Sequence, residues 1–402
     1  MRGPLFTTIG ALRARPGIPG FRCNRKDDMR RYEVLAKAAT AATAVVGLAA
    51  FGLVGSASAA ASVGAVHNVT GEYNLSTNGS LACPPGQPLA TGTCYMVGTT
   101  GTFSYTATSS TTNVIVPVTD GVAGTNVQLP ASEYISYISC TSGPNCIALG
   151  SNTLGGTFFY WLDSGKVVKT VTVPAKGYYW AGLSCGSATY CVASGSKGVG
   201  SQTVGAVAVM SNGVVSLHRV ATVIGNGVSC YAPTACLVVG TSHQGSGTAY
   251  GTLVEVKGGV TGLVHATSSE SLAGVTCGWQ AGICRATGSV AAGNGGFYPA
   301  TAIIKGTTAA VTKLAGDASP GDAVCPAVGQ CVEFGVVNPN SKGEHAFVAV
   351  ATGGAVGTSL TVPGLADVYS VSCPQVGACD GVGSLLHGPH GDYSLATFTL
   401  RY

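Results

Sequence analysis

From residue 60 onward, short apolar runs alternate with clusters of Gly, Ser, Thr and Asn, and no stretch repeats its apolar residues at helical spacing. One run ends at Ser184-Cys185, five residues follow, and the next run begins at Cys191. The following unit repeats this plan at Ser229-Cys230 and Cys236. Two apolar runs joined by a short loop of turn-forming residues predict a β-hairpin. Directly opposed residues of such a hairpin have Cα atoms about 4.5–5.5 Å apart, close enough for a disulfide.

Two further strands follow each cysteine hairpin, separated by turns such as Asp163-Ser164-Gly165 and Ser211-Asn212-Gly213. Val- and Thr-rich runs favour strands over helices. Glycine contributes 60 of 402 residues, about twice its average share, which suits tight turns. The strand pairs are clearest in three repeats, at 156–162 with 166–173, 205–210 with 214–220, and 249–256 with 260–265.

The hairpins recur at a nearly constant interval. Successive second cysteines are 52, 45, 45, 48, 47 and 48 residues apart, and a period of this length indicates a repeat architecture. Four strands per repeat predict an all-β, seven-bladed β-propeller with one disulfide in each blade. The predicted pairs are Cys83 with Cys94, Cys140 with Cys146, Cys185 with Cys191, Cys230 with Cys236, Cys277 with Cys284, Cys325 with Cys331, and Cys373 with Cys379.

The ends of the chain agree with a closed ring. The last repeat stops after its third strand, at 393–402, and a surplus stretch at 65–75 precedes the first cysteine pair. This stretch is expected to add the fourth strand of the last blade and so remove the exposed edges. A β-solenoid usually has shorter coils, and a chain of seven disulfide minidomains would need linkers that the sequence lacks.

Residues 1–59 are expected to be a leader, and residues 60–402 the propeller. Arg30 and Arg31 precede an apolar run at 38–54, and Ala57-Ser58-Ala59 provides the small residues of a signal-peptidase site. Met29 is a candidate true start. A retained membrane anchor is the alternative, and the sequence leaves export by the general or the twin-arginine route open.

Charge and cysteine usage indicate the compartment. Nine of the 20 Lys/Arg and three of the 16 Asp/Glu precede residue 60, so 11 basic and 13 acidic residues remain. Clustered basic residues are therefore lacking, and nucleic acid is not an expected partner. No later apolar run reaches the ~20 residues of a membrane span. Paired cysteines suit an oxidising environment, whereas zinc sites use shorter spacings with further ligands nearby. We expect a secreted bacterial protein, monomeric and without a cofactor.

The repeated Ser-Cys, five residues, Cys unit resembles the cysteine-paired repeats of secreted bacterial propellers in the sialidase/BNR-like superfamily. The resemblance covers residues 60–402 and implies the propeller fold. It also implies that loops between blades, and between second and third strands, form the ligand-binding face. The family's Asp-box is present only as Asp163-Ser164-Gly165-Lys166, without its Thr-Trp end. Three arginines remain after the leader, too scattered for the sialidase arginine triad, so sialidase activity is not expected.

Three groups of residues are candidates for a site. Tyr178, Tyr179 and Trp180 fall in one blade-connecting loop, and their rings either stack on a ligand or pack between blades. Histidines of the second-to-third-strand loops are weak metal candidates, with His387, His390 and Asp392 on one loop and His243, Glu344 and His345 on others. Carboxylates for glycoside hydrolysis would come from Glu133, Glu270, Asp317, Asp322 and Asp367.

The sequence therefore favours an extracellular binding or scaffold module for a glycan or protein ligand, not an enzyme. The alternative is a glycan-active hydrolase or lyase that uses loop carboxylates or histidines. A purely structural envelope protein is the third hypothesis.

Overall fold

The architecture is taken from a computed structural model. It describes residues 61–69, 73–74, 80–100, 112–129, 133–142, 145–199, 202–220, 224–244, 248–265, 270–280, 283–291, 297–306, 308–313, 318–337, 344–352, 355–387 and 392–402. The predicted leader, with Cys23 and Met29, lies outside the described residues. No helix in the described segments has the length and hydropathy of a membrane span.

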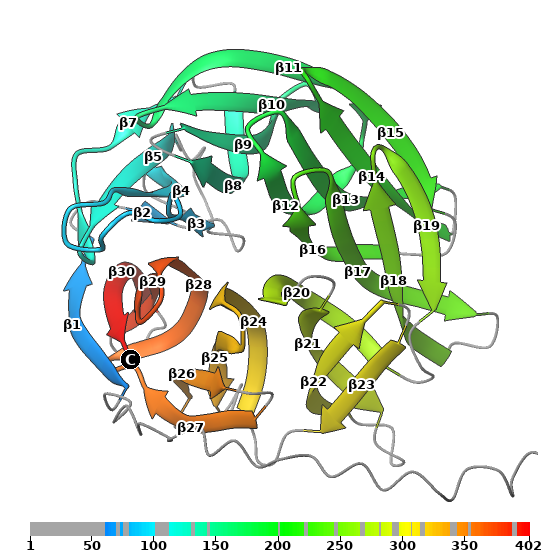
Figure 1. The fold of residues 1–402 in the computed structure, drawn as a ribbon. Helices are drawn as coiled ribbons and strands as arrows, with labels where there is room; N and C mark the ends of the chain where they lie inside the picture. The colour runs from blue at the N-terminus through cyan, green and yellow to red at the C-terminus, as the bar shows by residue number, and fades with distance from the viewer. Residues whose placement is uncertain are drawn as a thin grey trace, which may run out of the picture. The chain divides into compact units, whose positions relative to one another are not determined.

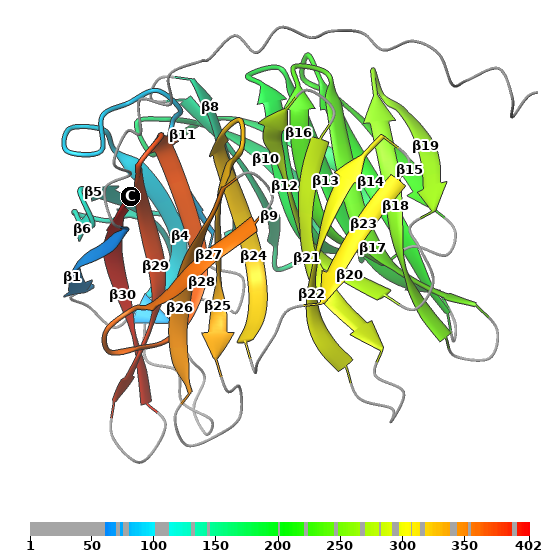
Figure 2. The ribbon, with the colours of Figure 1, turned by 60° about the horizontal axis from the view of Figure 1, so that its bottom comes forward.

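Seven antiparallel sheets follow one another along the chain and form the blades of a β-propeller (Figure 1). In blades 2 to 6 the strand order within the sheet is the order in the chain. The first strands of neighbouring blades pack beside each other around the axis, and Figure 2 shows the blades from the side. The predicted fold, an all-β propeller of seven blades, is confirmed.

Blades 2 to 6 each contain four strands that follow one another from the axis outward. Blade 2 consists of β8 (Glu133–Ser142), β9 (Asn145–Asn152), β10 (Gly156–Asp163) and β11 (Lys166–Lys176), and blade 3 of β12 (Tyr179–Ser187), β13 (Tyr190–Val199), β14 (Gln202–Ser211) and β15 (Val214–Val220). Blade 4 consists of β16 (Ile224–Ala232), β17 (Ala235–Gln244), β18 (Thr248–Lys257) and β19 (Val260–His265), and blade 5 of β20 (Glu270–Gln280), β21 (Ile283–Ala291), β22 (Phe297–Lys305) and β23 (Thr308–Lys313). Blade 6 consists of β24 (Ala318–Ala327), β25 (Gln330–Val337), β26 (His345–Thr352) and β27 (Ala355–Thr361).

Blade 1 has two long central strands, with shorter pieces on either side. Its strands are β2 (Tyr73–Asn74), β3 (Leu81–Ala82), β4 (Cys94–Thr100), β5 (Thr112–Thr119), β6 (Val122–Ala123) and β7 (Val127–Gln128).

Blade 7 is completed from both ends of the chain. Its strands are β28 (Leu365–Gln375), β29 (Ala378–His387), β30 (Asp392–Arg401) and β1 (Ser62–Asn68), which pairs antiparallel with β30. The predicted closing by an N-terminal strand is confirmed, but its predicted bounds, 65–75, were wrong. The strand starts at Ser62 because it pairs with Arg401 at the end of β30, and Tyr73–Asn74 pairs with β4 of blade 1 instead.

The outer hairpins of blades 1 to 3 turn on two residues with positive φ. In blade 2, φ is 49° at Ser164 and 79° at Gly165, and in blade 3 it is 52° at Asn212 and 81° at Gly213. Asp120-Gly121 has φ of 49° and 75°. Positive φ at both central residues defines a type I′ turn, which matches the twist of the flanking strands. These turns place 163–165 between the third and fourth strands, as the sequence predicted.

All seven predicted disulfides are present, each within one blade, with Cα atoms 3.7–4.1 Å apart. In blades 2 to 7 the bond joins the first two strands, and in blades 2 to 5 its two cysteines are directly opposed in the ladder. The predicted pairing is therefore confirmed throughout: Cys83 with Cys94, Cys140 with Cys146, Cys185 with Cys191, Cys230 with Cys236, Cys277 with Cys284, Cys325 with Cys331, and Cys373 with Cys379.

The second cysteine of each pair is the more deeply buried one. Its side chain is part of the apolar packing between blades, whereas most of the first cysteines are only half-buried. The disulfides therefore anchor each hairpin to the core of the propeller. The second cysteines, none more than 3% exposed, are Cys94, Cys146, Cys191, Cys236, Cys284, Cys331 and Cys379.

A hydroxyl on the residue before the first cysteine links neighbouring blades at five of the seven joints. Cys230 N–H donates to Ser184 Oγ at 3.0 Å, and Cys277 N–H donates to Ser229 Oγ at 2.8 Å. The same bond joins blades 2 and 3, 5 and 6, and 7 and 1 through Ser139, Thr276 and Ser372. The repeated Ser-Cys pair therefore orients neighbouring blades as well as closing its own hairpin.

Ser184→Ala is expected to lower the free energy of unfolding by about 1–3 kcal/mol, because the part-buried Cys230 N–H loses its acceptor. Thermal unfolding followed by circular dichroism measures the change. Ser216→Ala on the outer strand β15, where the serine is exposed, is the matched control. Equal melting temperatures for the two variants would contradict this role for Ser184.

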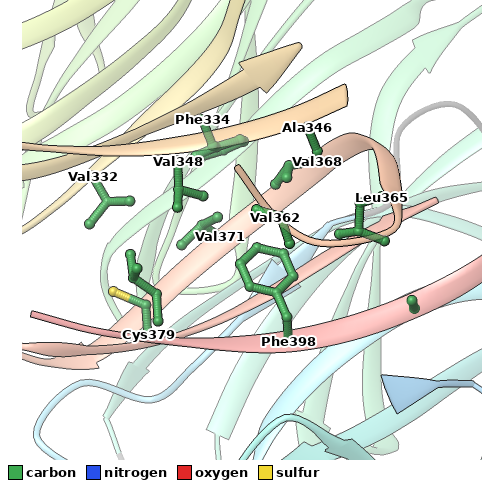
Figure 3. Close-up of a cluster of buried hydrophobic side chains, with 12 residues drawn as sticks. Val332, Phe334, Ala346, Val348, Val362, Leu365, Val368, Val371, Cys379 and Phe398 are labelled. Atoms are coloured by element: carbon green, nitrogen blue, oxygen red, sulfur yellow. The ribbon is translucent and has the colours of Figure 1, made fainter. Parts of the chain in front are cut away.

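The apolar core is divided among the blade-to-blade joints. The largest cluster lies between blades 6 and 7, where Phe334 and Val348 meet Val368, Val371 and Phe398 (Figure 3). Among the described residues, the joint between blades 5 and 6 has the smallest cluster, which consists of Cys325, Cys331 and Ala351 with Ile283 packed against it.

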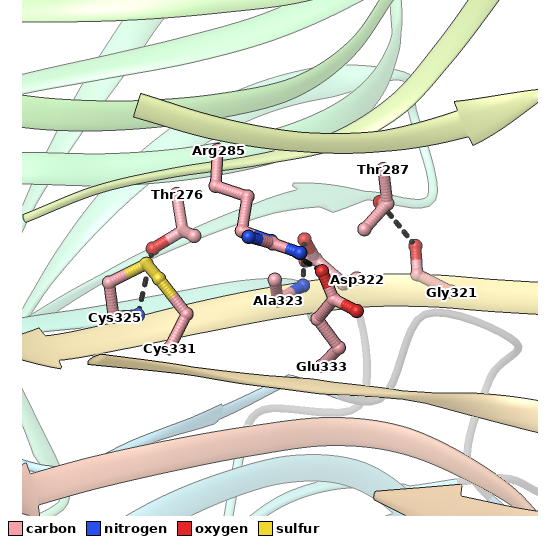
Figure 4. Close-up of polar contacts among 9 residues, drawn as sticks. All are labelled: Thr276, Arg285, Thr287, Gly321, Asp322, Ala323, Cys325, Cys331 and Glu333. Carbon is pink, nitrogen blue, oxygen red and sulfur yellow. Dashed lines mark hydrogen bonds and ion pairs between the residues drawn. A yellow bond between two sulfur atoms is a disulfide. The ribbon is translucent and has the colours of Figure 1, made fainter. Parts of the chain in front are cut away.

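A buried ion pair occupies the joint between blades 5 and 6. Arg285 of β21 donates from Nε to Glu333 Oε1 of β25, and the two side chains are 3% and 1% exposed (Figure 4). Burial raises the pKa of Glu333, an effect that the Arg285 charge opposes. Arg285 Nη2 has no hydrogen-bond partner among the described residues. Charge therefore takes the place of an apolar core at this joint.

Candidate functional site

A cavity on the propeller axis is the principal candidate site. Its volume is about 400 Å³, and every blade contributes to its wall. The lining residues are Ser80, Tyr137, Ala181, Gly182, Leu183, Asn226, Gly227, Val228, Ala273, Gly274, Val275, Gly321, Asp322, Asp367, Val368, Tyr369 and Ser370.

The cavity coincides with a β-bulge in the inner strands. In blades 2 to 6 the extra residue lies four positions before the first cysteine, at Ser136, Ala181, Asn226, Ala273 and Gly321. A bulge leaves its extra residue unpaired and bends the strand. The bulges therefore open the cavity at one level in successive blades and bring Asn226 and Gly321 to its wall.

Two of the five predicted carboxylates meet at this cavity. Asp322 comes from β24 and Asp367 from β28, so adjacent blades supply them. Desolvation raises the pKa of Asp322 to about 7, although its Oδ1 accepts a 2.8 Å bond from Ala323 N–H. Desolvation also raises the pKa of Asp367 to about 6, helped by the negative charge of Glu344 and opposed by the Val368 N–H. Both groups are protonated over part of the neutral range.

Gly274 makes room for the Asp322 carboxyl. A Cβ at position 274 would lie 2.2 Å from Asp322 Oδ1. Any other residue there would displace the carboxyl group, so the glycine of blade 5 helps to position the acid of blade 6.

Of the other three predicted carboxylates, Glu133 has a described side chain, and it does not line this cavity. Glu133 begins β8 and is half-buried. The Glu270 side chain and Asp317 lie outside the described residues.

The three predicted aromatic residues have different environments. Trp180 is 7% exposed, packs in the cluster between blades 2 and 3, and donates from Nε1 to Thr157 Oγ1 at 3.1 Å. Tyr178 packs at 5.9 Å from the Trp180 ring, with Lys197 Nζ 5.3 Å from its centroid. Tyr179 is 63% exposed. Trp180 therefore packs between blades, which was the alternative to ligand stacking in the sequence analysis.

Tyr179 begins β12, two residues before Ala181, which lines the axial cavity. It contributes to the rise of the Tyr137 pKa, after the larger effect of burial, and Tyr137 lines the cavity. Of the three aromatic residues, Tyr179 is therefore the best candidate to meet a ligand at the cavity.

The histidine candidates are largely outside the described structure. His345 begins β26, and the backbones of His243 and His387 lie in β17 and β29. The described part of the structure does not include His390 or the side chains of His243, His387 and Asp392. The metal prediction for His387, His390 and Asp392 therefore stays a prediction. One compact group in the described chain, Cys83, Cys94 and Asp380, has ligand-like spacing, but its sulfurs form a disulfide and are not metal ligands.

The opposite end of the axis has a different character. A hollow of about 350 Å³ there is lined by Cys140, Cys185 and Cys230 of the disulfide hairpins and by Pro85 and Pro233. The cysteine spacing in the sequence locates the end of the axis that carries this hollow. The lining of the axial cavity could be located from the sequence only by counting three and four residues back from each first cysteine, and that rule requires knowledge of the bulge.

No known family model matches the chain, and no curated protein matches it. Solved structures do. U3-55K is 8% identical, with 84% of this chain and 98% of that chain covered and a TM-score of 0.53. The β-propeller domain of the Trilobed protease from Pyrococcus furiosus is 9% identical, with 80% and 95% covered and a TM-score of 0.51. These likenesses show the propeller fold. The subtype N11 neuraminidase-like protein of A/flat-faced bat/Peru is 13% identical over 85% of this chain and 94% of that chain, with a TM-score of 0.44.

Proposed function

We propose that the protein is an extracellular binding module that recognises a glycan on the face of the blade-connecting loops. The observation that carries the proposal is the axial cavity, to which all seven blades contribute, with the exposed Tyr179 two residues from its lining residue Ala181. The seven disulfides support a location outside the cell, because disulfides persist in oxidising compartments. We further propose that the protein is secreted by a bacterium and acts as a monomer, without nucleic acid as a partner.

The chemistry of the cavity suits a sugar. A cavity of about 400 Å³ is in the range of small-ligand sites. Asn226, Asp322, Asp367 and Ser370 offer hydrogen-bonding groups to hydroxyls, and an exposed tyrosine ring can pack against the face of a sugar.

Tyr179→Ala is expected to weaken glycan binding at least about tenfold, through the loss of a large, rigid and exposed contact beside the cavity. The measurement is binding of residues 60–402 to a panel of glycans and cell-wall polymers. Val328→Ala, an exposed residue in the cysteine hairpin of blade 6, is the control on the opposite face and should bind as the wild type does. Binding that survives in Tyr179→Ala would contradict a glycan contact at Tyr179. If the wild type binds no polymer, a protein ligand or a scaffold role is the remaining function.

A glycan-active hydrolase is the second candidate, favoured by the two carboxyls with raised pKa values at one cavity. A protonated carboxyl can act as general acid toward a glycosidic oxygen, with the second carboxylate as base or nucleophile. Release of new reducing ends from a polymer that the protein binds tests this function. Binding without release supports the binding module.

A further inference from the structure

We propose that the axial cavity takes a positively charged ammonium group of its ligand, so that glycans bearing amino groups are preferred to neutral and acidic ones. The inference rests on the proposed function in that it assumes a glycan as the carrier of the ammonium group. The group itself is recognised by the cavity whatever carries it.

The charges that face the cavity have one sign. Asp322 and Asp367 are the charged side chains among its described lining residues. Both are half-buried, and attraction between opposite charges is stronger in such a partly desolvated site than in bulk water. A cation that enters between blades 6 and 7 therefore stabilises the two carboxylates, because its attraction replaces the interactions with water that they lose on folding.

Neighbouring charges do not cancel this field. Glu344 lies close enough to add to the negative potential at Asp367. The one buried cation among the described residues, Arg285, is paired with Glu333 in the joint between blades 5 and 6. An anionic sugar would bring a further negative charge into the same space.

Two tyrosines complete a surface suited to an ammonium group. Tyr137 of blade 2 and Tyr369 of blade 7 line the cavity together with the carboxyls. The negative face of an aromatic ring attracts cations, and quaternary ammonium ligands are bound by cages of such rings. Asn226 adds an amide, but its Nδ2 already donates to Leu272 O at 2.7 Å and Thr241 Oγ1 at 3.2 Å.

The test compares two probes that differ only in charge: choline and its uncharged carbon isostere, dimethylbutanol. Titration calorimetry at about pH 8.5, above the pKa values of about 7 and about 6, keeps both carboxyls ionised. The wild type is expected to bind choline at least about tenfold more tightly than the isostere. Asp322→Asn combined with Asp367→Asn should remove that preference, and each single variant should reduce it. Asp163→Asn, an exposed carboxylate in the outer turn of blade 2, is the matched control.

Equal affinity of the wild type for the two probes would overturn the inference. A choline preference that survives in the double variant would equally overturn the placement in the cavity. Failure of the proposed function has a different signature. Polymer binding that depends on Tyr179 without a choline preference leaves the glycan module standing and removes the ammonium site. A choline preference displaced by lysine peptides but not by amino-sugar oligomers leaves the ammonium site standing and removes the glycan.

Discussion

Glu333→Gln is expected to lower the free energy of unfolding by about 3–5 kcal/mol, because the substitution leaves the Arg285 charge buried without a counter-charge. Both residues are almost fully buried, and Arg285 Nη2 already lacks a partner among the described residues. The apolar cluster at this joint is the smallest in the described chain, so little other burial compensates.

Chemical denaturation of the wild type and variant measures this loss. Arg285→Met with Glu333→Leu in one protein should recover most of the stability, since apolar pairs often replace buried ion pairs at little cost. Lys257→Met, which removes the exposed pair of Lys257 Nζ with Glu255 Oε1 at 2.8 Å, should change stability by less than about 1 kcal/mol. A Glu333→Gln protein as stable as the wild type would show that the pair is not needed at this joint.

Raising the pH from acid to neutral is expected to destabilise the propeller through Asp380. This residue of β29 is fully buried in blade 7, its Oδ1 has no partner in the described part of the chain, and its Oδ2 lies 3.1 Å from the Cys94 sulfur of blade 1. Burial raises its pKa from 3.8 to about 7, with Asp120 raising it further and the Gly121 backbone and Arg401 opposing. The folded state therefore holds the proton more tightly than the unfolded state does.

The direction of the effect follows from proton linkage. Well below pH 3.8 Asp380 is protonated in both states and contributes nothing to the pH dependence. Between 3.8 and about 7 the unfolded state loses its proton first, so stability falls as the pH rises and levels off above about 7. Such a shift corresponds to a loss of up to about 4 kcal/mol. Asp322 and Asp367 act in the same direction.

Melting temperatures between about pH 4 and pH 8 measure this dependence. Asp380→Asn should flatten the curve and stabilise the protein above about pH 7, because it removes an ionisable group from the joint. Asp163→Asn, exposed in its turn, should follow the wild type. A wild-type curve that rises toward neutral pH would contradict the prediction.

The repeat made most of the fold predictable. Fourteen cysteines at a fixed period indicated the number of blades, and the incomplete last repeat indicated the closing strand, because both depend on spacing along the chain. The bounds of β1 were not predictable, since they follow from pairing with β30, more than 300 residues away in the chain.

The site was less predictable, because it depends on which residues of different blades reach the axis. Asp322 and Asp367 were candidates together with three other carboxylates, and their nearness to one cavity follows from the bulges of the inner strands. Trp180 illustrates the opposite case. Its predicted place in a blade-connecting loop made it a candidate ligand contact, but it lies in β12, and its hydrogen bond to Thr157 is buried in a blade joint.

Closing the axial cavity with a side chain tests the proposed site most directly. Gly321 lines the cavity, and a Cβ there would meet only Phe334 O at 3.7 Å, an ordinary contact, so Gly321→Trp is expected to fold with its ring in the cavity. Gly262→Trp on the outer strand β19 is the matched control, because a Cβ there has no neighbour within 4 Å and Gly262 does not line the cavity. The measurement is binding of both variants to the glycan panel. Loss of binding in Gly321→Trp with binding retained in Gly262→Trp is the predicted result, and wild-type binding by a folded Gly321→Trp protein would contradict the axial site.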